Sequence, residues 1–195
     1  RRRSRLAFTM TTLVLATTLF VAIFSVRASL FLTLDTALKY FQFDIQAGFK
    51  QAYPIQRFED AVLAVPGAVK MEAWATGSTF RVRPDGTQSK AISISAVPAT
   101  TIMWQPNMLQ GRWLTPDDED VIVVSTDVIK DNPDIKLGNE IVLKIEGKET
   151  TWQVIGIFQG ISLIGPILHV NYPYFSRLTH NPDRSDFIGL ATERH

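Results

Sequence analysis

The longest run of apolar positions lies near the N-terminus. Residues 6–26 are 21 consecutive uncharged positions rich in Leu, Val, Ile, Phe, Ala and Thr. As an α-helix they would extend about 31 Å, which matches a hydrocarbon core of about 30 Å. Their threonine hydroxyls dilute the apolarity, but such a hydroxyl can hydrogen-bond to its own helix backbone inside a membrane. The run therefore predicts a transmembrane helix.

Two other readings of this run stay open. A secretory signal peptide also begins basic and then apolar, and Val26-Arg27-Ala28 is loosely similar to a small-residue cleavage site. A signal h-region is about 7–15 residues long, however, and here the apolar run is longer with no polar region behind it. A buried helix of a soluble domain is the third reading, but such a helix rarely carries four arginines at one end. A retained membrane anchor is favoured.

The apolar pattern continues as one stripe beyond the predicted span. Residues 28–43 contain no Gly or Pro, and Phe31, Leu34, Leu38 and Phe41 recur at spacings of three and four. This spacing is typical of one face of a helix. We expect a helical stalk over residues 27–44, whose stripe packs either on its own domain or against another helix of a membrane unit, where it would relay movement.

A mixed pattern of strands and a helix follows over residues 45–100. Alternating apolar residues at 41–49 indicate a half-buried strand, and Pro54 stands where a helix can begin. Pro66-Gly67 ends that helix, and further alternation indicates strands at 69–75, 79–83 and 91–97, with a turn at 84–87. We expect a β-α-β-β-β arrangement.

The pattern over residues 101–195 is richer in strands. An acidic turn at 117–120 precedes the continuously apolar residues 121–125, which indicate a strand covered on both faces. Next, the pattern predicts a short helix near Val128, a hairpin of residues 141–145 and 151–157, and a strand at 167–171. It then predicts a helix at 173–178 and a last strand at 186–192. The predicted fold class is α+β: an N-terminal transmembrane helix extended into a stalk, then a mixed α/β extracytoplasmic domain with a β-rich second subdomain.

The distribution of charged residues predicts how the transmembrane helix is oriented in the membrane. Five of the 20 Lys and Arg but none of the 19 Asp and Glu lie in the first 27 residues, which leaves a formal charge of −4 from residue 28 onward. The positive-inside rule then makes residues 1–5 a cytoplasmic basic tail and places the main body outside the cell membrane. A net acidic body argues against nucleic acid as a partner. The chain has no Cys, and hence no disulfide framework and no thiolate metal site.

Residues that would indicate catalysis are scarce. Gly147-Lys148 lacks the rest of a phosphate-binding loop, and the residues at 160–165 do not fit a nucleophile elbow. His169, His180 and His195 are too dispersed for a metal pattern, and the acidic run at 117–120 lacks the alternating oxygen spacing of a calcium loop. We expect no catalytic residue, cofactor or metal.

One ordered set of short motifs resembles a known family. In chain order these motifs are Gly111-Arg112, the acidic turn at 117–120, the apolar strand at 121–125, Leu137-Gly138, Val154-Ile155-Gly156-Ile157 and Val170-Asn171-Tyr172-Pro173. Behind an N-terminal span, this order resembles the MacB-like extracytoplasmic core domain of FtsX-like permeases of ABC transporters. The motif glycines suit close approaches barred to side chains, and Arg112 can pin the acidic turn by ion pairs.

The resemblance implies a coupling role. It implies a cytoplasmic ABC-type ATPase partner, a second permease subunit, membrane lipid and an extracytoplasmic adaptor as possible partners, and further membrane helices beyond the chain. ATP hydrolysis by the partner would drive export, extraction or release of a peptide, lipid, lipoprotein or drug. The alternative from another class is a single-span ligand-binding or sensor module; a membrane-tethered enzyme is disfavoured by the lack of a nucleophile and base.

Overall fold

The computed structural model divides the chain into two compact units, Arg1–Lys39 and Tyr40–His195. It describes residues 2–161 and 164–192, without the side chains of residues 2, 4, 35–39 and 63. Each unit is described by itself.

The long helix α1 (Arg2–Tyr40) makes up the described part of the first unit, and its last residue, Tyr40, belongs to the second unit. Its stretch Arg5–Leu34 is long and apolar enough to cross a membrane, with a mean hydropathy of 2.1 and no side chain buried within the chain. Several threonine hydroxyls donate to the carbonyl four residues earlier at 2.8–2.9 Å, as expected of hydroxyls in an apolar medium. These are Thr9, Thr11, Thr12, Thr17 and Thr33. The predicted N-terminal apolar helix is confirmed.

The prediction that the helix continues through residue 44 is wrong in its last residues. α1 ends at Tyr40, and Phe41 instead forms an isolated antiparallel bridge with Trp104. The Gln42 N–H donates to the Met103 carbonyl at 3.0 Å. Backbone groups that pair with another segment are not available for helical hydrogen bonds, so the helix stops and Phe41 leaves the predicted stripe.

The second unit is built on a nine-stranded sheet with the strand order β1-β9-β2-β3-β8-β5-β7-β4, in which β6 pairs with β2 and β7. The strands are β1 (Ile45–Pro54), β2 (Ala68–Val82), β3 (Gln88–Val97), β4 (Met108–Gly111), β5 (Val121–Ser125), β6 (Glu140–Ile145), β7 (Lys148–Phe158), β8 (Ile167–Asn171) and β9 (Arg184–Thr192). The helices are α2 (Ile55–Leu63), α3 (Thr126–Asp131) and α4 (Tyr172–Leu178). This confirms the predicted mixed α/β domain.

β2 is one strand of 15 residues that serves two groups of strands. Residues 68–74 pair with β9, whereas residues 75–82 pair with β3 and residues 79–82 also pair with β6. The sequence pattern predicted two strands here, because the small and polar residues 76–78 interrupt the alternation. The strand continues through them because β3 pairs along this whole segment.

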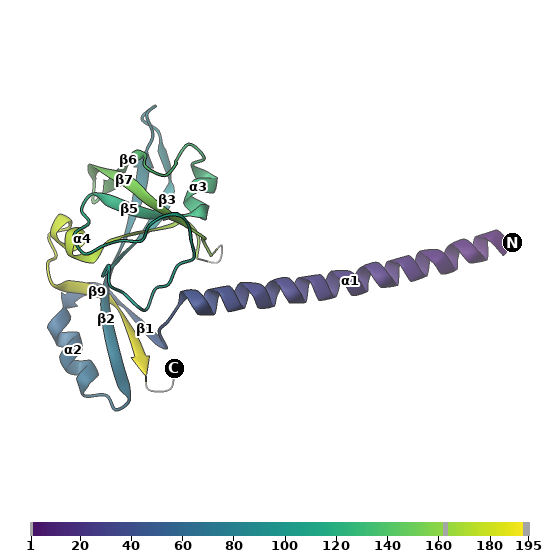
Figure 1. The fold of residues 1–195 in the computed structure, drawn as a ribbon, viewed down its shortest axis with the longest axis horizontal. Coiled ribbons are helices and arrows are strands. Elements are labelled where there is room, and N and C mark those ends of the chain that lie inside the picture. The colour runs from purple at the N-terminus through teal and green to yellow at the C-terminus, as the bar shows by residue number, and fades with distance from the viewer. Residues whose placement is uncertain (1, 162–163, 193–195) are drawn as a thin grey trace. The chain divides into compact units, whose positions relative to one another are not determined.

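We name the two groups of strands the small lobe and the large lobe. The small lobe contains β1, β9, residues 68–74 of β2, and α2, which packs on β1 and β2 (Figure 1). The large lobe contains the remaining strands with α3 and α4. β9 lies between β1 and β2, so the last strand of the predicted 101–195 part pairs with strands of the predicted 45–100 part.

The core of the large lobe is apolar and continuous. It includes Ile122 and Val124 of β5, Leu143 of β6, and Trp152 and Val154 of β7, all at most 1% exposed. The burial of residues 122–125 confirms the prediction that this apolar strand is covered on both faces.

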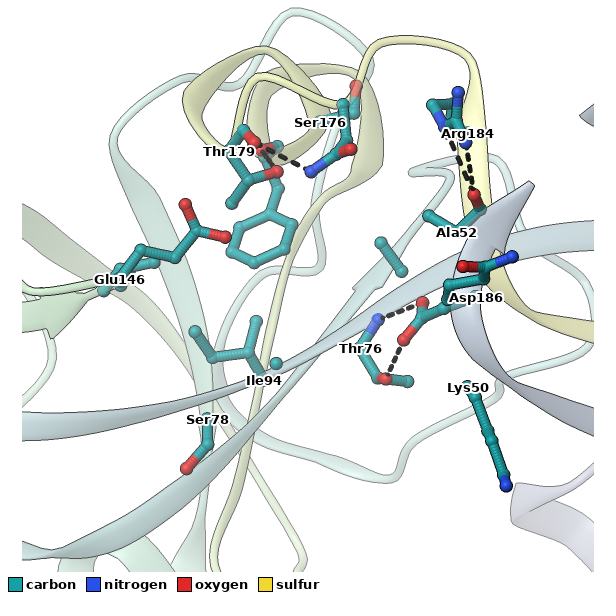
Figure 2. A pocket seen from close by; sticks show the side chains of 16 residues that line it. Lys50, Ala52, Thr76, Ser78, Ile94, Glu146, Ser176, Thr179, Arg184 and Asp186 are labelled. Atoms are coloured by element: carbon teal, nitrogen blue, oxygen red, sulfur yellow. Dashed lines mark hydrogen bonds between the residues drawn. The ribbon is translucent and has the colours of Figure 1, made fainter. Parts of the chain in front are cut away.

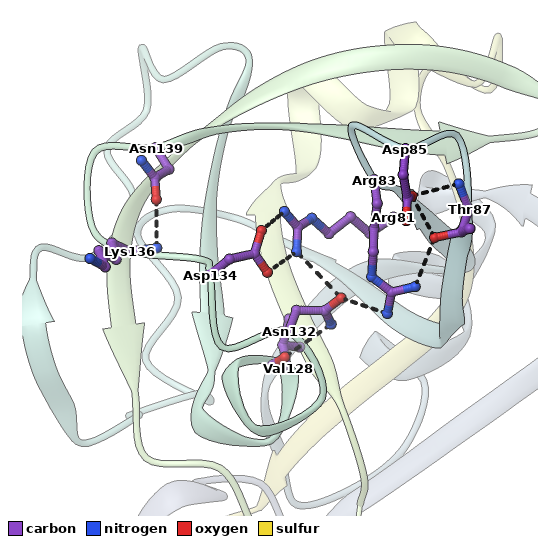
Figure 3. Close-up of polar contacts among 9 residues, drawn as sticks. All are labelled: Arg81, Arg83, Asp85, Thr87, Val128, Asn132, Asp134, Lys136 and Asn139. Carbon is purple, nitrogen blue, oxygen red and sulfur yellow. Dashed lines mark hydrogen bonds and ion pairs between the residues drawn. The ribbon is translucent and has the colours of Figure 1, made fainter.

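A polar cluster ties the β2–β3 hairpin to the end of α3 (Figure 3). The Arg81 guanidinium is only 6% exposed and donates to both carboxylate oxygens of Asp134, at 2.7 Å to Oδ1. Arg83 donates to Asn132 Oδ1 at 3.4 Å, and Asn132 Nδ2 donates to the Val128 carbonyl at 3.1 Å. Arg81 lowers the pKa of Asp134 to about 2, mainly by these hydrogen bonds.

Candidate functional site

The last residue of α1 is a core residue of the domain. Tyr40 is 4% exposed, and its hydroxyl lies 2.9 Å from Nε2 of His169 on β8, which is fully buried. Burial raises the pKa of Tyr40 and lowers the pKa of His169 to about 4, because desolvation disfavours both charged forms. The contact is therefore a hydrogen bond between two neutral groups. It holds the side chain of the last helical residue in the core of the second unit.

Aromatic rings surround this contact, and we call them the junction cluster. Its members are Tyr40, Phe41, Phe43, Trp74, Trp104, Phe158 and His169. Trp104 lies at its centre, with ring centroids 5.3–5.4 Å from those of Tyr40, Phe41, Trp74 and His169. Aromatic pairs at this distance stabilise by about 0.5–1.5 kcal/mol each beyond the burial of their area.

Backbone hydrogen bonds reinforce the same place. The Gln105 N–H donates to the Tyr40 carbonyl at 3.1 Å, next to the bond from Gln42 to Met103. The Asp44 N–H donates to the Leu190 carbonyl of β9 at 2.9 Å. Residues 40–44 are thus connected both to the β3–β4 loop and to the small lobe.

A buried glutamate holds the loop that carries Trp104. Glu72 of β2 is 7% exposed, and its carboxylate accepts from the Ile102 N–H at 3.2 Å and from the Thr101 hydroxyl. Lys70 pairs with the same carboxylate at 3.0 Å. A buried carboxylate without these partners would be costly, so they fix the loop against β2.

The family-motif residues gather elsewhere, where β4 crosses β7. Gly111 pairs with Gly156, and a Cβ added at Gly156 would lie 2.3 Å from the Arg112 carbonyl oxygen. Gly111 has φ +73°, and its added Cβ would lie 2.6 Å from Leu137 Cδ1. Both positions therefore require glycine. Leu137 is 43% exposed beside this crossing.

The remaining motif residues frame the same strands. Gly138, at φ +83°, donates its N–H to the carbonyl of the fully buried Val154 at 2.8 Å. Arg112 forms a two-pronged contact with Asp118, with both distances 2.7 Å, and this contact lowers the pKa of Asp118 to about 2. Pro173 lies apart from the crossing, in the first turn of α4.

The acidic turn is joined to α4 as well as to Arg112. Tyr174 donates its hydroxyl to Asp120, and Arg177 pairs with Glu119 at 2.5 Å. The predicted ion pair of Arg112 with the acidic turn is present, specifically at Asp118. These contacts give the acidic residues of the turn a structural role.

The predicted relay stripe is only partly described. Phe31 is 59% exposed and Leu34 is 49% exposed, and both lie within the apolar stretch that ends at Leu34. The side chain of Leu38 lies outside the described residues, and Phe41 belongs to the junction cluster. The sequence pattern does not mark Tyr40, Trp104 or Glu72 as junction residues, and it predicts an isolated histidine at His169.

The described residues offer little metal or acid-base chemistry. Among residues 2–161 and 164–192, no group of three His, Asp or Glu side chains is arranged to hold a metal ion. His169, the most deeply buried histidine of this part, faces aromatic rings and a tyrosine hydroxyl. The contacts described for the junction cluster are packing and hydrogen-bonding contacts.

Comparison with known proteins agrees with this architecture. The extracellular domain of the noncanonic ABC-type transporter YknZ from Gram-positive bacteria has a TM-score of 0.55 at 13% identity, covering 76% of this chain and 82% of that structure. The periplasmic region of MacB from Actinobacillus actinomycetemcomitans has a TM-score of 0.54 at 16% identity, covering 73% of this chain and 65% of that structure.

At these identities the two structures show a shared fold. No curated protein sequence matches the chain. The profile of the MacB-like periplasmic core domain matches residues 6–193, which include the apolar helix as well as the domain. The chain belongs to the MacB-like periplasmic core domain family, found in FtsX-like permeases of ABC transporters.

Proposed function

We propose that the chain is the N-terminal part of an ABC transporter permease that couples ATP hydrolysis by a cytoplasmic partner ATPase to movement of its extracytoplasmic domain. The movement would export, extract or release a substrate such as a peptide, lipid, lipoprotein or drug. A second permease subunit, membrane lipid and an extracytoplasmic adaptor complete the proposed assembly.

The observation that supports coupling is the burial of Tyr40. A tether would leave the end of the helix exposed and joined to the domain by a loop with few contacts. Here the last helical residue is 4% exposed, hydrogen-bonded to His169 and packed on Trp104. A displacement of this residue must therefore displace the β3–β4 loop and β8 with it, because close-packed interiors transmit strain.

The test is a flexible glycine-serine linker inserted between Lys39 and Tyr40 of the full-length permease, reconstituted with its ATPase in a membrane. Residues 1–195 contain no Cys, so once any cysteines in the rest of the permease and in the ATPase are replaced, a single Asp85→Cys substitution provides a unique label in the exposed β2–β3 turn. We expect the ATP-dependent change in the signal of a probe attached to this cysteine to be lost, while ATP hydrolysis continues.

The control is the same linker inserted at Gly147, away from the label, whose φ of +84° and open surroundings mark a surface turn. This insertion should keep both hydrolysis and the label response. A label response unchanged by the linker at Lys39 would refute coupling through Tyr40. The label should also react with membrane-impermeant reagents in intact cells, as the proposed cytoplasmic N-terminus and external domain require.

The stripe on α1 is the second element of this proposal. Phe31, Leu34 and Leu38 would pack on a neighbouring helix of the assembled permease. Changing Leu34 and Leu38 to Asn should then uncouple hydrolysis from movement, since each large side chain lost from a packed face costs about 2–5 kcal/mol. An unchanged label response would mean that this face contacts only lipid.

A further inference from the structure

The middle of β2 has one edge that no described strand covers. On this edge the pairing with β9 ends at Trp74, opposite Phe187, and the pairing with β6 begins only at Thr79, opposite Ile145. On the other edge, residues 75–80 pair with β3 throughout. Residues 75–78 therefore form a gap in the sheet, at the boundary between the small and large lobes.

Backbone groups of two residues point into this gap. The Thr76 N–H donates to Asp186 Oδ1 at 2.8 Å, and Asp186 lies on β9, so Thr76 directs its backbone toward the uncovered edge. In an antiparallel ladder the N–H and C=O of every second residue point to the same side. The carbonyl of Thr76 and both backbone groups of Ser78 thus face the gap, where an added extended segment would find them.

A cavity of about 360 Å³ occupies the gap (Figure 2). Its walls come from β1, β9, the turn after β6, and α4, whose Phe175 ring covers Gly77. A Cβ added at Gly77 would lie 3.3 Å from that ring, so the glycine permits this close cover. The volume falls within the range of about 300–1,000 Å³ of pockets that bind small ligands.

Opposite charges stand at the two sides of the gap. Figure 2 shows Glu146 and Lys50 on opposite sides of Thr76. Arg184 and Asp186 already have partners, since Arg184 donates to the Ala52 carbonyl at 2.7 Å and Asp186 accepts from Thr76. Within the described part of the chain, Lys50 and Glu146 have no ion-pair partner. They are free to contact a ligand.

We propose that this gap binds a short extended peptide, whose backbone pairs with the Thr76 carbonyl and with the N–H and carbonyl of Ser78 on β2. Its amino group faces Glu146 and its carboxylate faces Lys50. Addition of a strand to an open edge supplies main-chain hydrogen bonds, and the charged side chains at the two ends select a free peptide. The site lies outside the junction cluster, so the proposal stands independently of coupling through Tyr40.

The test titrates the full chain in detergent micelles with tetra-alanine and with tetra-alanine that is N-methylated at every peptide bond. Calorimetry gives the affinity, and the Ser78 amide resonance reports the place of binding. N-methylation removes the donors needed for pairing and should weaken binding about tenfold or more. Undetectable binding of tetra-alanine, or equal binding of the methylated peptide, would overturn the proposal.

Charge variants test the orientation of the peptide. Glu146→Gln should weaken binding of tetra-alanine about two- to fivefold but leave its N-acetylated form unaffected, as expected for an exposed ion pair. Glu149→Gln is the matched control, because Glu149 lies exposed on the same hairpin outside the cavity. An equal loss in both variants would show a general charge effect and contradict the assigned role of Glu146.

Discussion

The junction cluster and the crossing of β4 over β7 both bring distant backbone segments together, but with opposite kinds of side chain. At the junction, Trp104 fills the space between Tyr40, Trp74 and His169 with large rings. At the crossing, Gly111 and Gly156 leave no room for even one carbon. The first contact is sensitive to removal of atoms and the second to addition of atoms, and the predictions below test this difference.

The largest effect is expected for Trp104→Ala. Loss of this 8% exposed ring should lower the free energy of unfolding by about 3–5 kcal/mol, because it removes buried area and leaves a cavity. Urea unfolding of the full chain in detergent, followed by near-UV circular dichroism, measures it. Phe80→Ala is the control, since Phe80 is 39% exposed and its truncation should cost much less. Equal losses would show that the junction cluster is no more sensitive to removal of atoms than a half-exposed position.

The next largest effect is expected for Gly156→Ala, which should lower the free energy of unfolding by about 1–3 kcal/mol through overpacking. The added methyl meets the Arg112 carbonyl oxygen at 2.3 Å and must displace backbone. Gly147→Ala separates this clash from backbone conformation, because Gly147 has φ +84° but open space around it. It should cost about 1 kcal/mol. Because Gly156 is not among the glycines of positive φ, a larger loss in Gly147→Ala would show that backbone conformation costs more than this contact does.

The free energy of unfolding should depend on pH because of His169, the buried histidine of the junction cluster. Burial lowers the pKa of folded His169 to about 4, from an ordinary 6.5 in the unfolded chain. Between these values the unfolded chain binds a proton that the folded chain does not, so stability falls as the pH falls from 6.5 to 4. The slope from this group is at most about 1.4 kcal/mol per pH unit.

Unfolding of the wild type and of His169→Phe across this range measures the contribution. The difference between the two slopes isolates the histidine, because other titrating groups contribute to both. We expect a flatter profile in His169→Phe. Parallel profiles would mean that His169 does not titrate differently in the folded and unfolded chain.

The smallest effects concern the ion pairs around the acidic turn. Arg177→Gln should cost well under about 1 kcal/mol and less still at high salt, because Arg177 and Glu119 are both more than half exposed. Arg112→Gln should cost more, since its two-pronged contact is with Asp118, which is only 10% exposed. The reverse order would indicate that the contacts to α4, and not Arg112, hold the turn.

Much of the fold could be predicted because its signals are local. The continuous apolar run at 121–125 and the hairpin around Gly147 each carry their own pattern, and the structure has strands at both places. β4 was missed because its residues, Met108–Gly111, are few and three of them are exposed. The position of β9 between β1 and β2 depends on pairing across more than 100 residues, which no local pattern encodes.

The motif glycines and the junction cluster also differ in how far they can be predicted from the sequence. Gly111, Gly138 and Gly156 are visible in the sequence because glycine is itself the signal of close approach or positive φ. The junction is not visible, since Tyr40 reads as part of a helix and its partner His169 lies 129 residues later. The one available hint is the density of aromatic residues at 40–43, directly after the apolar helix.

The pairing of β1 with β9 has a consequence for the path of the main chain. The Thr192 N–H and hydroxyl donate to the Asp44 carboxylate at 2.7 and 2.9 Å, so the chain enters the domain beside the place where β9 ends. The two ends of the segment 44–192 therefore lie close together. A short peptide linker between them would connect the two ends, and new termini could be opened at the exposed turn around Gly86. The domain is therefore a candidate for circular permutation.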